Sequence, residues 1–485
     1  MITIKLIFTV LVPLLLGYSA TSVMIREKIS FLERGALAWG IGLGLLGIEM
    51  FAMSLLGITL NLRNVLIPTV SLTALLIIYA YYFKTLSFGL ETIPFFLSNL
   101  VGQINKRHSW QFYFEKVIII LIGLTIVYVF FDALVKPTIE FDAMWRQGTI
   151  AKIIFSTGKV MTEQAQTVAG PHPYLNPLAQ AWIYMGIGQW NDALGKIVFP
   201  LCFTSLLFIF YFRLRPQTSR LKALIFTYLL TSFPLIILHS GNAYSDLMQT
   251  FYYSTGAIYL LSWFKENKPY YLFTSAFLFG IGNFVKQSGI PLWGAAVIVL
   301  TLFLMFERPK EIWNGLKALV ITAFVSSLWL FSNKSFLFGF LGSLSAKLFP
   351  ADRAVSPLVS GGTTTQPAAP ALADLIYHLG RRMFTYADWQ ILWFVFIVVS
   401  ILGAGLIWRS YLKYGFILII INLAMIIYAF SNAGTYQYLV DGTLVNRLMM
   451  YQAPFVLFYC ATVITLILSE CEPPVITKIK KKRVK

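Results

Sequence analysis

Acidic residues are scarce in this chain of 485 residues, which has 20 Asp and Glu against 38 Lys and Arg. Charged residues of both signs make up only 12% of the chain, about half of the roughly 25% that is typical of soluble domains. Hydrophobic residues make up 58%, and the mean hydropathy is +0.73. This composition excludes a sizeable soluble domain and indicates a polytopic membrane protein.

Cysteine is also rare, with only three residues. Cys202 and Cys460 lie in apolar runs and Cys471 lies near the C-terminus, so no disulfide framework or metal pattern follows. The apolar runs do not alternate as barrel strands would, so we expect helices, which satisfy their own backbone in lipid. The net charge of +18 comes from basic residues between the runs and in the tail KIKKKRVK, which indicates membrane topology rather than nucleic-acid binding.

Apolar runs of membrane-spanning length recur along the whole chain. The first run, from Ile2 to Gly17, has little n-region and no persuasive cleavage site, so we interpret it as a span rather than a signal peptide. The runs predict an all-α polytopic protein with about 13 transmembrane helices, at residues 3–21, 36–58, 64–84, 114–135, 193–212, 221–239, 246–264, 270–285, 289–306, 315–333, 390–408, 414–430 and 451–469.

The distribution of Lys and Arg predicts the orientation of these spans. With the basic tail in the cytoplasm, the short outer loops carry only Arg63, Lys286 and Arg447, as the positive-inside rule requires. Two long loops then lie outside, and we expect both to carry interfacial helices. The predicted regions are N-terminal helices with a cytoplasmic connection (1–113), a core (114–333) containing the first outer loop (136–192), the second outer loop (334–389), and C-terminal helices with the tail (390–485).

The second outer loop has two parts with different compositions. SPLVSGGTTTQPAAPA, residues 356–371, is typical of a mobile segment. ADLIYHLGRRMFTYADW follows it and predicts an amphipathic helix lying on the membrane. In the second span, GLGLLG has the small-residue spacing of close helix packing, and Glu49 serves either that packing or a lipid-facing cavity.

The stretch FDAMWRQGTIAKIIF places Glu140 and Asp142 where an apolar run ends. Trp145, Arg146 and Thr149 follow at helical spacing, which predicts an interfacial helix with Asp142 at its start. Two interpretations of Asp142 remain open at this point. The carboxylate is either a helix cap or a functional acid at the membrane surface.

Four further elements follow in order. The proline-rich turn GPHPYLNPLAQAWIYMGIGQWND carries His172 and Tyr174. SGNAYSDLMQTFY places Asp246 at the outer start of a span, where an ionisable residue is either functional or a cap. FVKQSG places Lys286, and VDGTLVNRLMMYQAPF places Arg447, just outside a span.

These five elements, in this order, resemble those of the GT-C superfamily of polytopic glycosyltransferases, in the branch of the protein O-mannosyltransferases and the aminoarabinose transferases. FDAMWRQGTIAKIIFSTG resembles the first acidic loop of that branch, PHPYLNPLAQAWIYMGIGQWND its proline-rich loop, and NAYSDLMQTFY its second acidic element. GNFVKQSGIPLW and LVNRLMMYQAPF resemble its later lysine and arginine elements. The chain departs from the family in its additional N-terminal spans and in the His172-Pro173 pair.

The resemblance implies an inverting hexosyl- or pentosyltransferase that moves a sugar from a polyprenyl-phosphate donor to a hydroxyl of a lipid, glycan or protein. It implies an integral protein of the bacterial inner membrane with its site on the extracytoplasmic face. Asp142 and Asp246 are the candidate catalytic carboxylates: Asp142 as the general base, and Asp246 to orient the acceptor or hold the active loop. The candidate substrate-binding residues are Glu140, Arg146, His172, Tyr174, Lys286 and Arg447. A divalent cation stays an open question.

Two other functions compete with this one: a transporter or flippase for a lipid-linked glycan, and an O-antigen-type polymerase or ligase. A transporter is expected to have internal repeats and polar groups near mid-membrane. The chain has no clear repeat, and its polar residues gather in the predicted outer loops. The order of acidic and proline-rich elements favours the glycosyltransferase over the polymerase.

Overall fold

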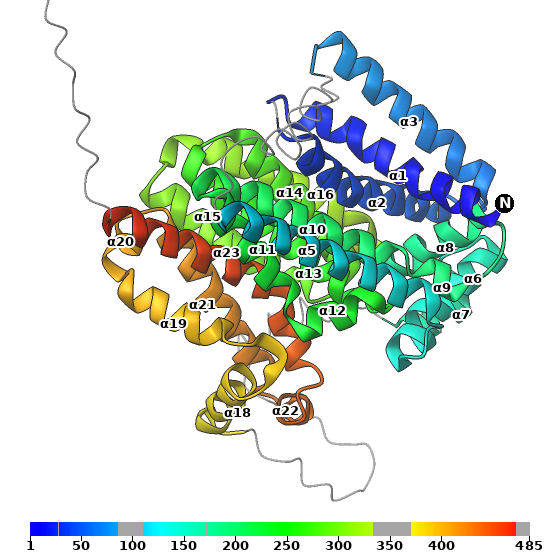
Figure 1. The fold of residues 1–485 in the computed structure, drawn as a ribbon. Coiled ribbons are helices and arrows are strands. Elements are labelled where there is room, and N and C mark those ends of the chain that lie inside the picture. The colour runs from blue at the N-terminus through cyan, green and yellow to red at the C-terminus, as the bar shows by residue number, and fades with distance from the viewer. Residues whose placement is uncertain (28, 86–109, 171, 333–369, 472–485) are drawn as a thin grey trace, which may run out of the picture.

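The computed structural model describes residues 1–27, 29–85, 110–170, 172–332 and 370–471 (Figure 1). Within these ranges every regular element is a helix and no strand occurs, which confirms the predicted all-α class for this part of the chain. Two predictions, the cytoplasmic connection at 85–113 and the mobile segment at 356–371, fall largely outside the described residues.

The N-terminal two thirds of the chain contain most of the helices. Before the first long loop these are α1 (Ile2–Met24), α2 (Phe31–Leu55), α3 (Leu62–Tyr82) and α5 (Trp110–Val135). The loop contains the π-helix η2 (Ala143–Gly148), α6 (Thr149–Thr157), α7 (Glu163–Ala169), α8 (Leu175–Ile187) and α9 (Asp192–Gly195). After it come α10 (Val198–Leu214), η3 (Arg215–Gln217), α11 (Arg220–Thr231), α12 (Pro234–Gly241), α13 (Ser245–Glu266), α14 (Pro269–Val285), α15 (Gly289–Phe306), η4 (Pro309–Glu311) and α16 (Ile312–Ser332).

The C-terminal part begins with the amphipathic helix that the sequence predicts, which is α18 (Leu372–Phe384). Leu375 and Leu379 on one side of α18 are buried, whereas Leu372 and Ile376 are exposed. The remaining elements are η5 (Ala387–Trp389), α19 (Leu392–Leu402), α20 (Ala404–Trp408), α21 (Leu412–Ala429), α22 (Ala433–Val440) and α23 (Val445–Cys471).

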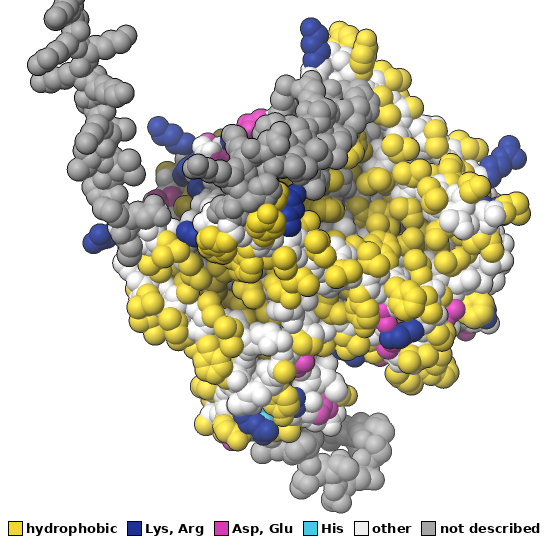
Figure 2. Space-filling view, viewed as in Figure 1, with side chains coloured by type: hydrophobic (Ala, Val, Ile, Leu, Met, Phe, Trp, Pro, Cys, Tyr) yellow, Lys and Arg dark blue, Asp and Glu magenta, His cyan; other side chains and the backbone are white. Residues whose placement is uncertain are grey.

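Among the described residues, eight helices are long and apolar enough to cross a membrane. A ninth span results if α11 and α12 are counted together, although they bend by 67° at their junction. The sequence predicts one span at 221–239. Pro234 starts α12, and it breaks that span because proline lacks the backbone N–H that would continue the helix. Figure 2 shows a face covered mainly by hydrophobic side chains, with charged side chains near its margins.

Helix α13 lies at the centre of the bundle, in contact with α10, α14, α15, α21 and α23. Every residue from Ser245 to Phe264 is buried. Its 22 residues correspond to a length of about 33 Å, enough to cross the apolar layer of a bilayer. Because protein rather than lipid surrounds α13, it can carry more polar side chains than the outer spans.

Helix α2 packs unusually close to its neighbours, as its small-residue spacing predicts. A Cβ atom at Gly42 would overlap the backbone oxygen of Pro13 in α1, and a Cβ at Gly17 would overlap that of Ala38. Gly44 faces Ile281 of α14, and Gly47 faces Leu175 of α8. The N-terminal helices therefore belong to the packed bundle.

Glu49 lies on another side of α2, where its Oε1 accepts a hydrogen bond of 2.8 Å from the Thr69 hydroxyl of α3. This contact supports the packing interpretation of Glu49. Helix α3 is otherwise largely exposed, with only Val65, Thr69 and Ala80 buried.

Candidate functional site

A small polar cavity lies at the end of the bundle where α13 begins. Its volume of about 30 Å³ holds roughly two water molecules and no sugar ring. It is lined by Asp142, Arg146, Gln147, His172, Tyr244, Ser245, Asp246, Val285, Lys286 and Arg447. Six of the eight residues predicted from the sequence are in this list, although up to 305 positions separate them along the chain.

Asp246 is the most enclosed acid of the cavity. It stands in the first turn of α13 and is only 2% exposed. One oxygen, Oδ1, accepts from Lys286 Nζ at 2.6 Å and from the Tyr451 hydroxyl at 2.5 Å. Lys286 follows the last residue of α14 in extended backbone, which turns its side chain out of the helix path. A buried carboxylate with both partners in place is held in one position.

Asp142 forms the second ion pair of the cavity, with Arg447 at the start of α23. Arg447 Nη1 donates to Asp142 Oδ2 at 2.8 Å. Its guanidinium carbon lies 4.6 Å from the centre of the Tyr244 ring, at cation–π distance. The Asp142 side chain is 38% exposed and that of Arg447 24% exposed, so this pair is accessible where the Asp246 pair is closed.

The structure shows no side-chain capping hydrogen bond from Asp142. The backbone angles of Asp142 are helical. The helix that follows starts as a π-helical turn, an uncommon conformation that is frequent at functional sites. That turn carries Arg146 and Gln147, which both border the cavity. Among the described residues the Arg146 side chain forms no ion pair or hydrogen bond, so its guanidinium is available for a ligand, whereas its backbone oxygen accepts from Thr149 N.

His172 also borders the cavity, on the segment that leads into α8. Burial lowers the pKa of His172 to about 4, and the nearby positive charges of Arg146 and Lys286 act in the same direction. The imidazole is therefore neutral near pH 7 and offers one donor and one acceptor.

Two predicted residues lie elsewhere. Tyr174 is buried and stacks on Phe51 of α2, with ring centres 5.7 Å apart, and burial raises its pKa to about 12. Glu140 is not among the cavity-lining residues. Its backbone oxygen accepts from Met144 N at 2.8 Å, and its buried Oε2 has no hydrogen-bond partner in the described part of the chain. The structure thus places Tyr174 in a packing contact with α2, and neither Tyr174 nor Glu140 lines the cavity.

Sequence reasoning missed Tyr451 and Tyr244. Tyr451 follows Arg447 by four residues, the spacing that puts two side chains on one face of a helix, and this signal points to it. Tyr244 is two residues before Asp246 in a turn, where no helical periodicity applies. Only its position under Arg447 reveals its role in the cavity.

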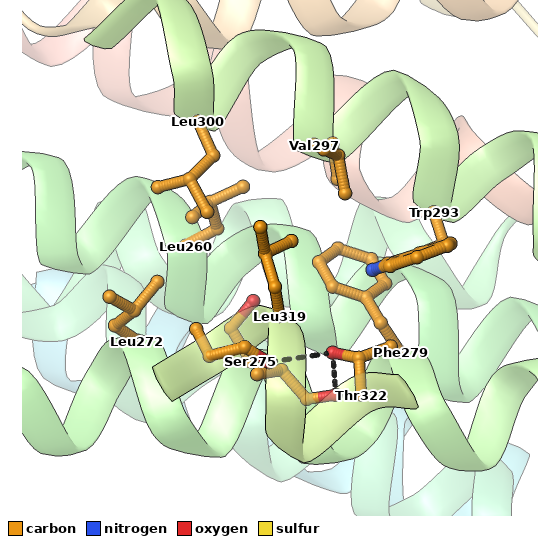
Figure 3. Close-up of a pocket in the computed structure, with 12 residues that line it drawn as sticks. Leu260, Leu272, Ser275, Phe279, Trp293, Val297, Leu300, Leu319 and Thr322 are labelled. Carbon is orange, nitrogen blue, oxygen red and sulfur yellow. Dashed lines mark hydrogen bonds between the residues drawn. The ribbon is translucent and has the colours of Figure 1, made fainter. Parts of the chain in front are cut away.

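A second cavity, of about 20 Å³, lies between α13, α14, α15 and α16 (Figure 3). Its lining is mostly aliphatic and aromatic, and it includes Thr322, whose hydroxyl donates to the carbonyl of Ala276 at 2.8 Å. No ionisable side chain lines it, so we interpret it as a packing gap. Among the described residues, no group of three His, Cys, Asp or Glu side chains is arranged to hold a metal ion.

Comparison of the chain with protein-family models, with curated proteins and with solved structures finds no match.

Proposed function

We propose that this protein is a membrane glycosyltransferase that moves a sugar from a polyprenyl-phosphate donor to an acceptor hydroxyl. One observation carries the proposal. Asp142, Asp246, Lys286 and Arg447 come from four separate elements of the GT-C resemblance, and they form two ion pairs around one cavity. His172, from a fifth element, lines the same cavity.

The charge of the cavity suits an anionic ligand. Three cations, Arg146, Lys286 and Arg447, face two carboxylates, Asp142 and Asp246, which leaves a net charge of 3 − 2 = +1. Guanidinium groups bind phosphate oxygens at two points, and ammonium groups act as point charges. A phosphate at the cavity mouth would therefore be drawn to Arg146 and Arg447.

Donor binding requires the Asp142–Arg447 pair to open, since the cavity is too small for a sugar as it stands. The donor phosphate replaces Asp142 as the partner of Arg447. This exchange keeps the positive charge of Arg447 paired with a negative charge, and it frees the Asp142 carboxylate beside the anomeric carbon. Because this pair is partly exposed, its opening leaves less buried charge without a partner than opening the Asp246–Lys286 pair would.

The reaction is a single displacement. Asp142 accepts the proton of the acceptor hydroxyl, the hydroxyl oxygen bonds to the anomeric carbon, and the bond from that carbon to the phosphate oxygen breaks. The electron pair leaves with polyprenyl phosphate, whose charge Arg447 and Arg146 stabilise. Attack opposite the leaving group inverts the configuration. Asp246, fixed by Lys286 and Tyr451, serves to hold these two side chains and not as the base.

The cavity lies at the starts of α13 and α23, at the end of the bundle rather than at mid-span. This position fits a donor whose phosphate lies at headgroup depth, and it differs from the mid-membrane sites of transporters. We place this end on the extracytoplasmic face of a bacterial inner membrane, with the C-terminus in the cytoplasm.

Labelling of single cysteines in intact cells tests this orientation. Thr167→Cys, in the loop next to the cavity, is expected to react with an impermeant thiol reagent, whereas Lys310→Cys is not. Thr167 and Lys310 are both exposed. Cys202 and Cys460 are buried, so a protein with Cys471→Ser is expected to react little with the reagent before the new cysteine is introduced. The reverse labelling pattern would overturn the orientation.

Transfer of radiolabelled sugar from polyprenyl-phosphate donors by the purified protein tests the function itself. Panels of hexosyl and pentosyl donors with lipid, glycan and peptide acceptors are needed, because the residues of the cavity do not specify the sugar. Turnover that depends on Arg447 supports the proposal. Lack of transfer across the panel, together with no donor binding, would overturn it.

A further inference from the structure

A chain of buried amides connects the cavity to α8. Asn176 is wholly buried, and its Nδ2 donates both of its hydrogens, to Ala243 O at 3.0 Å and to Ser245 Oγ at 3.1 Å. Its Oδ1 accepts from Gln180 Nε2 at 2.8 Å. Gln180 Oε1 in turn accepts from the Tyr184 hydroxyl at 3.3 Å.

The acceptors of Asn176 lie in residues 242–246, which join α12 to α13 and begin α13, and which we call the α12–α13 turn. This turn carries three residues of the cavity in succession: Tyr244 under Arg447, Ser245, and Asp246. Asn176 thus binds the backbone just before Tyr244 and the side chain just after it. Rotation of the turn would move the Tyr244 ring and the Asp246 carboxylate together.

Helix α8 is held on its other side by the N-terminal helices. Trp182 Nε1 donates to Thr9 O of α1 at 2.9 Å, and Gly186 lies against the Thr9 side chain. Leu175 fits against Gly47 of α2, and the neighbouring Tyr174 stacks on Phe51 of the same helix. Helices α1 and α2 therefore form a fixed support for α8.

We propose that Asn176 is a positioning residue for the active turn, and that the additional N-terminal helices serve the site by supporting α8 behind it. The inference assigns a structural task to α1 and α2, which lie far from the cavity in sequence. The effect of Asn176 on the α12–α13 turn does not depend on the proposed function, whereas its expected effect on kcat rests on that function.

Hydrogen exchange measured by mass spectrometry tests the effect on the α12–α13 turn. In Asn176→Leu, a peptide covering 242–246 is expected to exchange on the order of tenfold faster than in the wild type, because two acceptors lose their donor. Ser245→Ala removes one acceptor, is gentler to folding, and is expected to show a smaller increase. Unchanged exchange of this peptide in both variants would overturn the proposal.

Asn422→Leu is the matched control. Asn422 is a buried residue of α21, and its side-chain amide donates to the Tyr253 hydroxyl. Tyr253 belongs to α13, as Ser245 does, but it lies about two turns further along the helix. Asn422→Leu is expected to lose about as much thermal stability as Asn176→Leu, but the peptide covering 242–246 is expected to exchange no faster than in the wild type. Faster exchange there in Asn422→Leu would show that any loosening of α13 reaches the turn, and would overturn a specific role of Asn176.

The expected effect on kcat is tested by comparing kcat and KM for sugar transfer in the same variants. Asn176→Leu is expected to lower kcat about tenfold with little change in the donor KM, because misplacing groups around the reacting atoms slows the chemical step. Asn422→Leu is expected to keep both constants. Equal kcat losses in the two variants would reduce Asn176 to a stability residue. If the wild type transfers no sugar, the proposed function fails while the exchange result still decides the positioning role.

Discussion

Helix α13 carries a carboxylate at each end, and the two ends differ in how their charges are satisfied. The Asp246 cluster, at its start, consists of Asp142, Asp246, Lys286, Arg447 and Tyr451. The Glu266 cluster, at its other end, consists of Glu33, Arg213, Tyr259, Glu266 and Tyr271.

In the Glu266 cluster the protein satisfies its own charges. Arg213, with a side chain 6% exposed, lies 3.7 Å from Glu33 and donates to Glu266 at 3.0 Å and to the Tyr271 hydroxyl at 2.7 Å. The Tyr259 hydroxyl donates to Glu33 at 2.8 Å. Both clusters are partly exposed, at Glu266 (30%) and at Asp142 (38%), but in the Asp246 cluster the Asp142–Arg447 pair borders a polar cavity. The two clusters therefore differ in how their arginine is satisfied: Arg213 is enclosed by its own partners, whereas Arg447 faces a cavity. We call the Glu266 cluster closed and the Asp246 cluster open.

The largest effect is expected for Asp142→Asn in the open cluster. The amide keeps the size of the side chain and an acceptor for Arg447, but it cannot take a proton. Loss of a general base lowers rates by about 10² to 10⁴. Sugar transfer by purified protein measures the loss, after thermal denaturation has confirmed equal stability. Glu140→Gln, outside the cavity, is the control and retains more activity. Near-normal turnover by Asp142→Asn would remove it from the base role.

Arg213→Met removes the cation of the closed cluster. It is expected to lower the thermal stability and to leave kcat unchanged, the opposite of what is expected for Asp142→Asn. It leaves the Glu33 carboxylate buried without its cation, which typically costs about 3–5 kcal/mol of stability. The midpoint of thermal denaturation in detergent is expected to fall by several degrees. The kcat of the folded fraction stays near that of the wild type, because the cluster lies at the far end of α13. A selective loss of kcat with unchanged stability would contradict the division into closed and open clusters.

Arg447→Ala and Arg447→Lys test the role of the cation in the open cluster. If Arg447 exchanges Asp142 for the donor phosphate, the alanine variant loses donor affinity by about 2–5 kcal/mol. The lysine variant loses less, because it keeps the charge but not the two-point contact. Binding of a non-hydrolysable polyprenyl-phosphate analogue measures both. Equal donor affinity in the two variants and the wild type would leave Arg447 with a packing role only.

The smallest expected effect concerns His172 and acid. The pKa of His172 is about 4 in the folded protein against 6.5 for an ordinary histidine. Between these pH values the unfolded chain binds a proton at His172 that the folded protein does not bind. The contribution of neutral His172 to the free energy of unfolding is therefore fully present above pH 6.5 and decreases as the pH falls toward 4. His172→Gln is expected to flatten the dependence of the denaturation midpoint on pH in this window. An unchanged slope would show that other groups dominate the acid sensitivity.

The cavity shows which kinds of residue sequence reasoning recovers. Asp142, Asp246, Lys286 and Arg447 stand out because charges are rare in an apolar chain and because each lies next to a predicted span. Tyr174 is a candidate for the same cavity because it shares the proline-rich element with His172. Its ring turns to Phe51, because the contact between α8 and α2 buries it. Adjacent residues in a turn point in directions that periodicity does not predict.

From the amino-acid sequence alone it was possible to predict an all-helical protein with several apolar helices long enough to cross a membrane, and charges near the ends of those helices. These properties follow from local hydropathy and from the cost of leaving backbone or charge unsatisfied in lipid. Only the tertiary structure decided which charges pair. The ion pair of Asp142 and Arg447 joins residues 305 positions apart, and that of Asp246 and Lys286 joins residues 40 positions apart. The hydrogen bond from Asn176 to the α12–α13 turn likewise spans 67 positions. Such pairs depend on how the helices pack around α13, and packing is a property of side chains from many segments at once.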